Sequence, residues 1–397
     1  MKAILLPFFI FIISIFTIAQ EFNPAVDELI LETNLDSLNK YIMELTGEDS
    51  VMVNGNMLLL QNRIYDQNDS AAEYIKQKLT EFGLDPIEQQ YSSDGKNIYA
   101  IQEGSVYPDE HYIICAHYDA VTDYCADDDA SGCVAVLESA RLLSNLDFEY
   151  TIIYAFWDEE EIGLIGSAFY AAEASQNNDQ IKGVINLEMF GWDSNNDMEF
   201  DIHTQNYANS VELAELLVDI DETYNLLLEP VIYNPGTTAS DHSSFWNEGY
   251  GAVVFSEAFF GGDGNPYYHT SQDRVEHFNQ PYFHELSKLA VGTIATLANP
   301  IITSLQSTEL VSNDLQLLNF PNPFRDKTTI AFNLPKDGNV SVLIYDYLGN
   351  EIFKLSNKHF YEGDCTVDFQ SSSLPKGIYF VRLETDFGIT TSTIVKQ

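Results

Sequence analysis

The sequence predicts an α/β layered domain with a mostly parallel central sheet, followed by a small antiparallel β-sandwich. Between Asn97 and about Pro300, short apolar runs alternate with helix-like stretches, which is typical of strands joined by covering helices. Beyond Pro300, apolar residues recur at every second position, as in antiparallel strands. The 397 residues suffice for two or three domains, and a hydrophobic content of 45% excludes a disordered chain.

The elements of the first domain follow from these patterns. Four short apolar runs are expected to form buried strands, namely Tyr112–Cys115, Thr151–Trp157, Gly183–Met189 and Ala252–Ser256. Three longer stretches have an apolar stripe at helical spacing and are expected to cover the sheet, namely Val134–Leu146, Ser210–Leu227 and Pro281–Leu297. Residues 24–90 predict two helices and a strand that pack on the same domain.

The C-terminal part is expected to hold five strands and no chemistry, because it contains no cluster of histidines or acids. The strands are Thr328–Asn333, Val340–Tyr345, Cys365–Phe369, Ile378–Glu384 and Thr390–Val395. Turn pairs such as Asp337-Gly338 and Gly349-Asn350 separate them. The polar stretch 301–315 suits a linker, so the expected domains are 20–300 and 316–397.

The first 19 residues are expected to form a cleaved export signal. Lys2 precedes an apolar run from Ile4 to Ile18, and a small residue, Ala19, lies where a signal peptidase cuts. The alternative is a membrane anchor, but a run of about 15 residues is shorter than the ~20 that a spanning helix needs. No other stretch is long enough, so we expect a soluble mature protein without stable membrane insertion.

Charge and cysteine content exclude further classes of protein. Acids outnumber bases 61 to 18, for a formal net charge of -43, which would repel the phosphates of nucleic acids and anionic membranes. Four cysteines are too few for a disulfide scaffold. Cys115 is expected to be a buried thiol, and a bridge between Cys125 and Cys133 is left open.

Histidine and acidic residues gather where the predicted strands end, the edge at which α/β sheets build their sites. His117 and Asp119 close the first strand. Residues two apart in an extended segment point the same way, so this carboxylate can hold the imidazole. Asp127, Asp128 and Asp129 open the next helix. Helix capping explains one or two of these acids, whereas three adjacent acids repel one another unless a cation lies among them.

A second group of acids follows the second of these strands. The residues from Asp158 to Glu161 are four consecutive acids, which favours metal binding over a solvated charged loop. Of two adjacent glutamates, one can bind an ion while the other takes a proton from the ion's water. Glu188 is a single acid in an apolar strand, where its charge needs a partner. His242 and His269 become informative only beside the other residues.

Six motifs follow one another along the chain, namely H-x-D, A-D-D-D-A-S-G, E-E-x-G-L-x-G-S, N-L-E-M, S-D-H and H-T-S-Q-D. In this order they resemble peptidase family M28, the co-catalytic zinc peptidases whose best-known members are secreted aminopeptidases. The resemblance covers roughly residues 30–300. The resemblance implies a three-layer zinc-peptidase domain with two Zn²⁺ ions. The implied metal ligands are His117, Asp127 as the bridging carboxylate, Glu161, Glu188 and His269.

The resemblance also assigns roles to residues that bind no metal. Glu160 falls on the general base, and Asp119 on the acid behind His117. Asp128 would follow the bridging acid across a peptide bond that is often cis in this family. The resemblance favours His269 over His242 as the histidine ligand and leaves His242 as a structural hydrogen-bonding residue.

Two positions depart from the family pattern. The family usually has an aspartate where this chain has Glu188, which can weaken one metal site or favour another ion. Several secreted relatives carry a tyrosine as oxyanion donor three residues before the S-D-H motif, where this chain has Thr237. Tyr267 and Tyr268 are the candidate substitutes.

The implied function is a secreted di-zinc aminopeptidase that removes N-terminal residues from peptides or proteins, with Glu160 as general base. A glutaminyl cyclase with one zinc and a carboxypeptidase are alternatives of the same fold. A non-catalytic surface binding protein is an alternative of another class, although the intact base and ligand set favour an enzyme. A Ca²⁺ ion is a further candidate for the acid-rich stretch Asp193–Asp201, against the alternative of a solvated loop.

The C-terminal part resembles a type A sorting domain of the type IX secretion system. The motifs lie at Phe320–Phe324, Val342–Gly349 and Leu374–Tyr379. The resemblance implies passage through that machinery to the surface or exterior of a Gram-negative bacterium. A carbohydrate-binding sandwich is the alternative.

Overall fold

The computed structural model describes residues 22–301, 317–325, 327–334, 336–345, 351–370, 374–385 and 388–396. The export signal expected at residues 1–19 and nearly all of the expected linker 301–315 lie outside the described residues. The chain divides between residues 302 and 303 into two compact units. In the described part, no helix has both the length and the apolar composition needed to cross a bilayer.

An eight-stranded mixed sheet forms the centre of the first unit, in the order β3-β4-β6-β5-β7-β10-β8-β9. Strands β6, β5, β7 and β10 run parallel to one another, whereas β4 and β8 are antiparallel to their neighbours β6 and β10. The strands are β3 (Pro86–Gln90), β4 (Lys96–Gln102), β5 (Tyr107–His117), β6 (Tyr150–Trp157), β7 (Gln180–Glu188), β8 (Glu199–His203), β9 (Glu229–Tyr233) and β10 (Ala252–Glu257).

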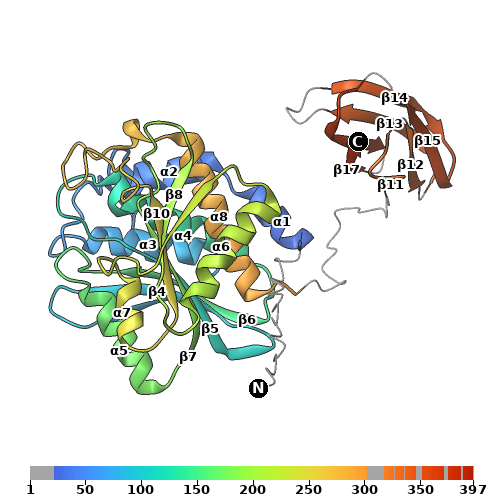
Figure 1. Ribbon diagram of the computed structural model, residues 1–397. Coiled ribbons are helices and arrows are strands. Elements are labelled where there is room, and N and C mark those ends of the chain that lie inside the picture. Colours follow the sequence, from blue (N-terminus) through green and yellow to red (C-terminus); the bar gives the residue numbers. More distant parts are fainter. Residues whose placement is uncertain are drawn as a thin grey trace, which may run out of the picture. The chain divides into compact units, whose positions relative to one another are not determined.

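Helices cover both faces of this sheet and complete three layers (Figure 1). The larger hydrophobic core lies on one face, under α1 (Pro24–Glu32), α2 (Leu35–Leu45), α3 (Asp69–Glu81), α4 (Gly132–Leu143), α6 (Ser210–Tyr224) and α8 (Gln280–Ala298). A smaller core lies on the opposite face, under α5 (Ile165–Asn177) and α7 (His242–Asn247). The α/β fold class with a mixed, mostly parallel sheet is therefore confirmed.

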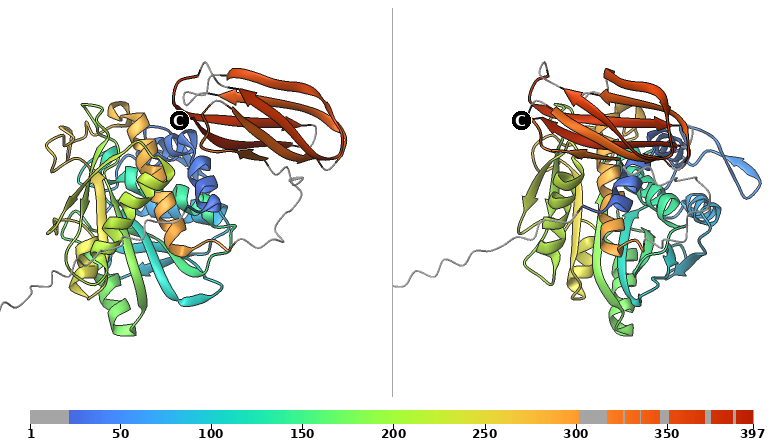
Figure 2. Two further views of the ribbon diagram at one scale, coloured as in Figure 1. Left: turned by 45° about the vertical axis from the view of Figure 1, so that its right-hand side comes forward. Right: turned by 90° about the vertical axis from the view of Figure 1, so that its right-hand side faces the viewer.

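The region 24–90 contains three helices, so the expectation of two was wrong. Helix α1 ends before Thr33, and helix α2 begins after Asn34. The Asn34 side chain accepts a hydrogen bond from the Ser37 N–H at 2.9 Å and so caps α2. Because the apolar pattern continues across this break, periodicity alone does not separate α1 from α2. The hairpin of β1 (Val51–Val53) and β2 (Asn56–Leu58), which was not expected, projects from the unit (Figure 2).

The second unit is an antiparallel sandwich of two sheets, as expected. One sheet contains β11 (Leu317–Phe320), β12 (Lys327–Leu334) and β15 (Gly363–Gln370). The other contains β14 (Glu351–Phe360), β13 (Gly338–Tyr345), β16 (Gly377–Thr385) and β17 (Gly388–Lys396). A common core of apolar side chains lies between them. Strands β11 and β14 were not expected, and the described residues of this unit contain no group of candidate metal ligands.

The carboxyl ends of β6, β5, β7 and β10 meet at one edge of the sheet, which positions the site. A buried arginine supports the loop at this edge. Arg63 is fully buried and donates to the carbonyls of Tyr118 (3.0 Å), Tyr124 (2.6 Å) and Cys125 (2.8 Å). The Arg63 guanidinium thereby holds the main chain of the segment between β5 and α4.

Candidate metal centre

Five loops or strand ends contribute side chains to one cluster. His117 is the last residue of β5, and Glu188 is the last residue of β7. Glu160 and Glu161 follow β6, whereas Asp128 lies in the short segment η1 (Ala126–Ser131) that leads into α4. The fifth contribution, His269, comes from the long loop after β10.

Asp128 lies between the two histidines. Its Oδ1 is 3.2 Å from His117 Nε2, and its Oδ2 is 3.1 Å from His269 Nε2. A carboxylate with one oxygen toward each of two imidazoles has the arrangement of a ligand shared by two ions. The sequence-based expectation gave this place to Asp127, and the structure corrects it by one residue.

Asp127 points away from the histidines into the protein. Its Oδ1 accepts a hydrogen bond from the Gly191 N–H at 2.6 Å, and its Oδ2 accepts one from Asn265 Nδ2 at 2.9 Å. The cis peptide bond joins Asp128 to Asp129, and not Asp127 to Asp128 as expected. Asp127 therefore holds neighbouring loops in place, and Asp128 faces the cluster.

Each histidine has one further carboxylate beside it. Glu188 Oε1 is 3.4 Å from His117 Nε2, and Glu161 Oε2 is 3.2 Å from His269 Nε2. Each histidine nitrogen Nε2 thus faces one oxygen of Asp128 and one glutamate. Glu160 also brings a carboxylate oxygen within 4.8 Å of ligand atoms of His117 and Glu188.

Asp119 holds both His117 and the glutamate loop. Its Oδ1 lies 3.2 Å from His117 Nδ1, so a proton on Nδ1 leaves the Nε2 lone pair free to face the cluster. The same carboxylate accepts hydrogen bonds from the N–H groups of Glu160 (3.1 Å) and Glu161 (3.2 Å). One buried acid thereby fixes a ligand and the general-base candidate together.

The imidazole and carboxylate groups of the cluster are of the kind that bind metal cations. Burial and the nearby charge of Asp128 raise the pKa of Glu161 to about 8, and burial raises the pKa of Glu160 well above its usual value. Glu161 Oε1 is buried and has no hydrogen-bond partner among the described residues. Acceptors that lack donors need cations, so the imidazoles and carboxylates fit metal ions.

The other motif residues lie outside this cluster. His242 is buried and its Nε2 lies 3.0 Å from the carbonyl of Thr237, while burial lowers its pKa to about 3, as expected of a structural histidine. In the acid-rich loop, Asp193 accepts hydrogen bonds from the Asn196 N–H and from Asn279 Nδ2. The described residues of this loop form no group of three metal ligands.

The four cysteines are all free thiols. Cys115 is buried as expected, and the bridge between Cys125 and Cys133 that the sequence left open is not formed.

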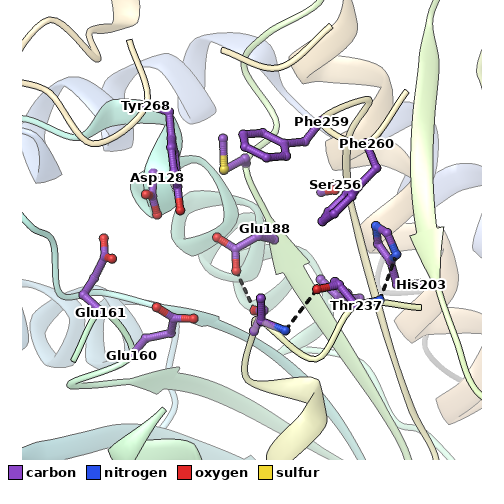
Figure 3. A pocket seen from close by; sticks show the side chains of 14 residues that line it. Asp128, Glu160, Glu161, Glu188, His203, Thr237, Ser256, Phe259, Phe260 and Tyr268 are labelled. Atoms are coloured by element: carbon purple, nitrogen blue, oxygen red, sulfur yellow. Dashed lines mark hydrogen bonds between the residues drawn. The ribbon is translucent and has the colours of Figure 1, made fainter. Parts of the chain in front are cut away.

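A pocket adjoins the cluster (Figure 3). It is a hollow of about 620 Å³ that opens to solvent. Its lining includes the cluster acids Asp128, Glu160, Glu161 and Glu188 and, beyond them, Met189, His203, Thr237, Ala239, Ser240, Val254, Ser256, Phe259, Phe260 and Tyr268. The sequence analysis did not identify His203, Ser256 or the two phenylalanines, because no motif marks them.

Two family models match the chain. One, described as peptidase family M28, matches residues 97–294, and the other, a secretion system C-terminal sorting domain, matches residues 319–397. Residues 97–294 belong to peptidase family M28. This part of the chain is accordingly a zinc metallopeptidase domain, and residues 319–397 are a sorting domain, which points to secretion or to the cell surface.

Individual proteins are similar to this chain in sequence or in fold. A probable leucine aminopeptidase of Trichophyton verrucosum is 28% identical over 275 residues, which are 65% of this chain and 69% of the relative. The LapA aminopeptidase of Legionella pneumophila shares the fold with a TM-score of 0.62 at 23% identity, over 76% of this chain and 81% of LapA. A glutaminyl cyclase of Bacteroides thetaiotaomicron shares it with a TM-score of 0.54 at 17% identity, over 66% of this chain and 97% of the cyclase.

Substitution of the two neighbouring aspartates tests which of them holds metal. We expect Asp128→Asn to reduce bound zinc to less than half of the wild-type content, because Asp128 faces both histidines. Asp127→Asn is the matched control and should retain zinc, although the loss of buried hydrogen bonds should cost roughly 1–3 kcal/mol of stability. Zinc per chain is measured by mass spectrometry of the dialysed protein. Loss of zinc from Asp127→Asn but not from Asp128→Asn would restore Asp127 as the ligand.

Proposed function

We propose that the chain is a secreted di-zinc aminopeptidase. The observation that supports this most directly is that Asp128 faces both His117 and His269, each of which also faces one glutamate. Glu160 lies beside His117 and Glu188, and a pocket adjoins the cluster. In this proposal His117, Asp128 and Glu188 hold one zinc ion, and His269, Asp128 and Glu161 hold the other.

The charges of such a centre balance. Two zinc ions carry four positive charges, and three ligand carboxylates with one hydroxide carry four negative charges. A buried cluster near neutrality avoids the large desolvation cost of uncompensated charge. Glu188, where the family usually has aspartate, reaches to 3.4 Å from His117 Nε2, so its extra methylene is accommodated.

Bound zinc lowers the pKa of a water molecule and polarises the substrate carbonyl. Glu160 accepts the proton of the attacking water and then gives it to the leaving amine, as its place beside His117 and Glu188 supports. Asp119 keeps His117 in the tautomer that presents Nε2 and holds the Glu160 main chain through its N–H group. The surplus of carboxylates at this end of the pocket suits the free α-ammonium group of a peptide, which would restrict cleavage to N-terminal residues.

Tyr268 is the proposed donor to the oxyanion that forms on the substrate carbonyl. It lines the pocket beside Asp128 (Figure 3), and its ring stacks on His269 with 3.7 Å between ring centroids. Burial and the charges of Asp128 and Glu161 raise its pKa, so the hydroxyl keeps its proton. Thr237, at the position where relatives have tyrosine, uses its hydroxyl oxygen to accept a bond from the Ala239 N–H.

Export completes the proposal. The sorting domain would carry the enzyme through the type IX secretion system of a Gram-negative bacterium, after removal of residues 1–19. Peptides or proteins outside the cell would then be its substrates, and the secretion machinery its partner. The domain limits 20–300, 301–315 and 316–397 are part of this proposal.

The first experiment separates the proposed enzyme from its alternatives. We expect the purified protein to hydrolyse leucine p-nitroanilide, but not the N-acetylated substrate, because the α-ammonium group is needed for binding. A chelator should abolish the activity and Zn²⁺ should restore it. The release of p-nitroaniline and the zinc content of the chain are measured together. Cleavage of blocked peptides from their C-terminus would instead indicate a carboxypeptidase, and no turnover at all would favour a binding protein.

Replacement of the general base is the second test. We expect Glu160→Gln to keep its zinc and to lose at least ~10²-fold in kcat, because an amide cannot accept the proton of water. Glu159→Gln is the matched control, since Glu159 interacts with Tyr91 rather than with the cluster, and its kcat should change by less than ~3-fold. Near-wild-type turnover in Glu160→Gln would exclude this residue as the base.

Substitution of two neighbouring tyrosines tests the assignment of the oxyanion donor. We expect Tyr268→Phe to lower kcat by about 10²-fold with little change in KM, as for the loss of one oxyanion donor. Tyr267→Phe should have nearly wild-type kinetics, because that ring stacks on His277 instead. Equal effects of the two substitutions on kcat would contradict the assignment.

A further inference from the structure

The wall of the pocket away from the metal cluster is formed by two paired strands. In the antiparallel pair β8/β10, His203 lies directly opposite Val254. Opposite residues of an antiparallel pair share a face of the sheet, and so does the residue two positions along a strand, which here is Ser256. All three residues line the pocket.

The protonation of His203 follows from its contacts. Its Nδ1 accepts a hydrogen bond from the Thr237 N–H at 3.2 Å, which is the dashed line beside His203 in Figure 3. A nitrogen that accepts from a main-chain N–H carries no proton, so the proton of the neutral ring lies on Nε2. Burial lowers the pKa of His203 to about 4, which keeps the ring neutral near pH 7.

The Nε2–H group of His203 is a donor without an acceptor. The side chain is only 2% exposed, and Nε2 has no hydrogen-bond partner among the described residues. The ring cannot turn easily to find one, because it stacks on Tyr233 (4.9 Å between centroids) and contacts Phe260 edge to face (4.6 Å). A buried donor without an acceptor is destabilising, and an acceptor on a bound ligand would remove that cost.

Ser256 offers the complementary group. Its hydroxyl donates to the carbonyl of Glu257 at 3.0 Å, so the oxygen lone pairs remain available to accept a bond. The lining also includes the apolar side chains of Met189, Val254 and Phe259. Apart from the four cluster acids, the lining contains no acidic side chain that would pair with lysine or arginine.

We infer that this pocket selects peptides whose N-terminal side chain is apolar along its first carbons and ends in a primary amide, as in glutamine or asparagine. His203 Nε2 donates to the amide oxygen, and Ser256 Oγ accepts from the amide nitrogen. This inference rests on the proposed aminopeptidase function and names its substrate class. A pocket without a donor would prefer an aliphatic residue of the same shape.

The test compares two isosteric substrates, glutaminyl-alanine and homoleucyl-alanine, which differ only in the terminal amide. We expect the wild-type protein with bound zinc to have kcat/KM for the glutamine peptide at least equal to that for the homoleucine peptide. His203→Phe should lower the ratio of these two values by at least ~10-fold and leave the homoleucine value within ~3-fold, because phenylalanine keeps a ring at this place but has no N–H donor for the amide oxygen. His203→Gln, which returns an N–H donor, should recover most of the ratio.

The remaining outcomes separate failure of this inference from failure of the proposed function. A wild-type preference for homoleucine of more than ~10-fold overturns the inference even if the variants do not fold, and so does an unchanged ratio in a folded His203→Phe protein. Either result leaves the aminopeptidase proposal intact, since homoleucyl-alanine is still cleaved. If neither peptide is hydrolysed, or if the glutamine peptide releases ammonia and forms a pyroglutamyl product, the proposed function itself fails.

Discussion

The concentration of negative charge at one edge of the sheet is the constraint on which the rest of this structure depends. Asp128, Glu160, Glu161 and Glu188 line one end of a single pocket, and burial raises the pKa of two of them. Such a cluster is compatible with a folded protein only if cations lie within it or protons neutralise it. Family membership and the two facing imidazoles agree with metal ions. The same ions would then supply the chemistry of the site and offset the repulsion among its acids.

A second set of acids holds this cluster without facing it. Asp119 accepts from the main chain of Glu160 and Glu161, Asp129 from His117 and Met189, and Asp273 from Asp127 and Asp128. Each of these carboxylates joins loops that come from different strands. Main-chain N–H groups therefore donate hydrogen bonds to the outer acids, whereas the inner acids face the proposed metal site. This division explains how several loops rich in acidic residues can pack around one small site.

In the proposed function, catalysis and side-chain selection take place at opposite ends of the same pocket. The proposed catalytic groups lie at or after the ends of β5, β6, β7 and β10, whereas the proposed selectivity groups lie on the paired strands β8 and β10. Because β10 pairs with both β7 and β8, the two ends are rigidly connected through one sheet. Substitutions on β8 can thus change which side chain is accepted without moving the ligands.

The sequence by itself determined the fold class, because apolar period and helix amphipathicity are local properties that survive into the folded state. The motifs also indicated the family. They predicted that His117, Glu160, Glu161, Glu188 and His269 belong to one site. Only the tertiary structure decided that Asp128 rather than Asp127 faces the histidines, since three consecutive aspartates are equivalent until the main chain fixes their directions. His203 could not be predicted for a related reason. Its significance lies in an unpaired buried nitrogen, and pairing depends on residues that are distant in sequence.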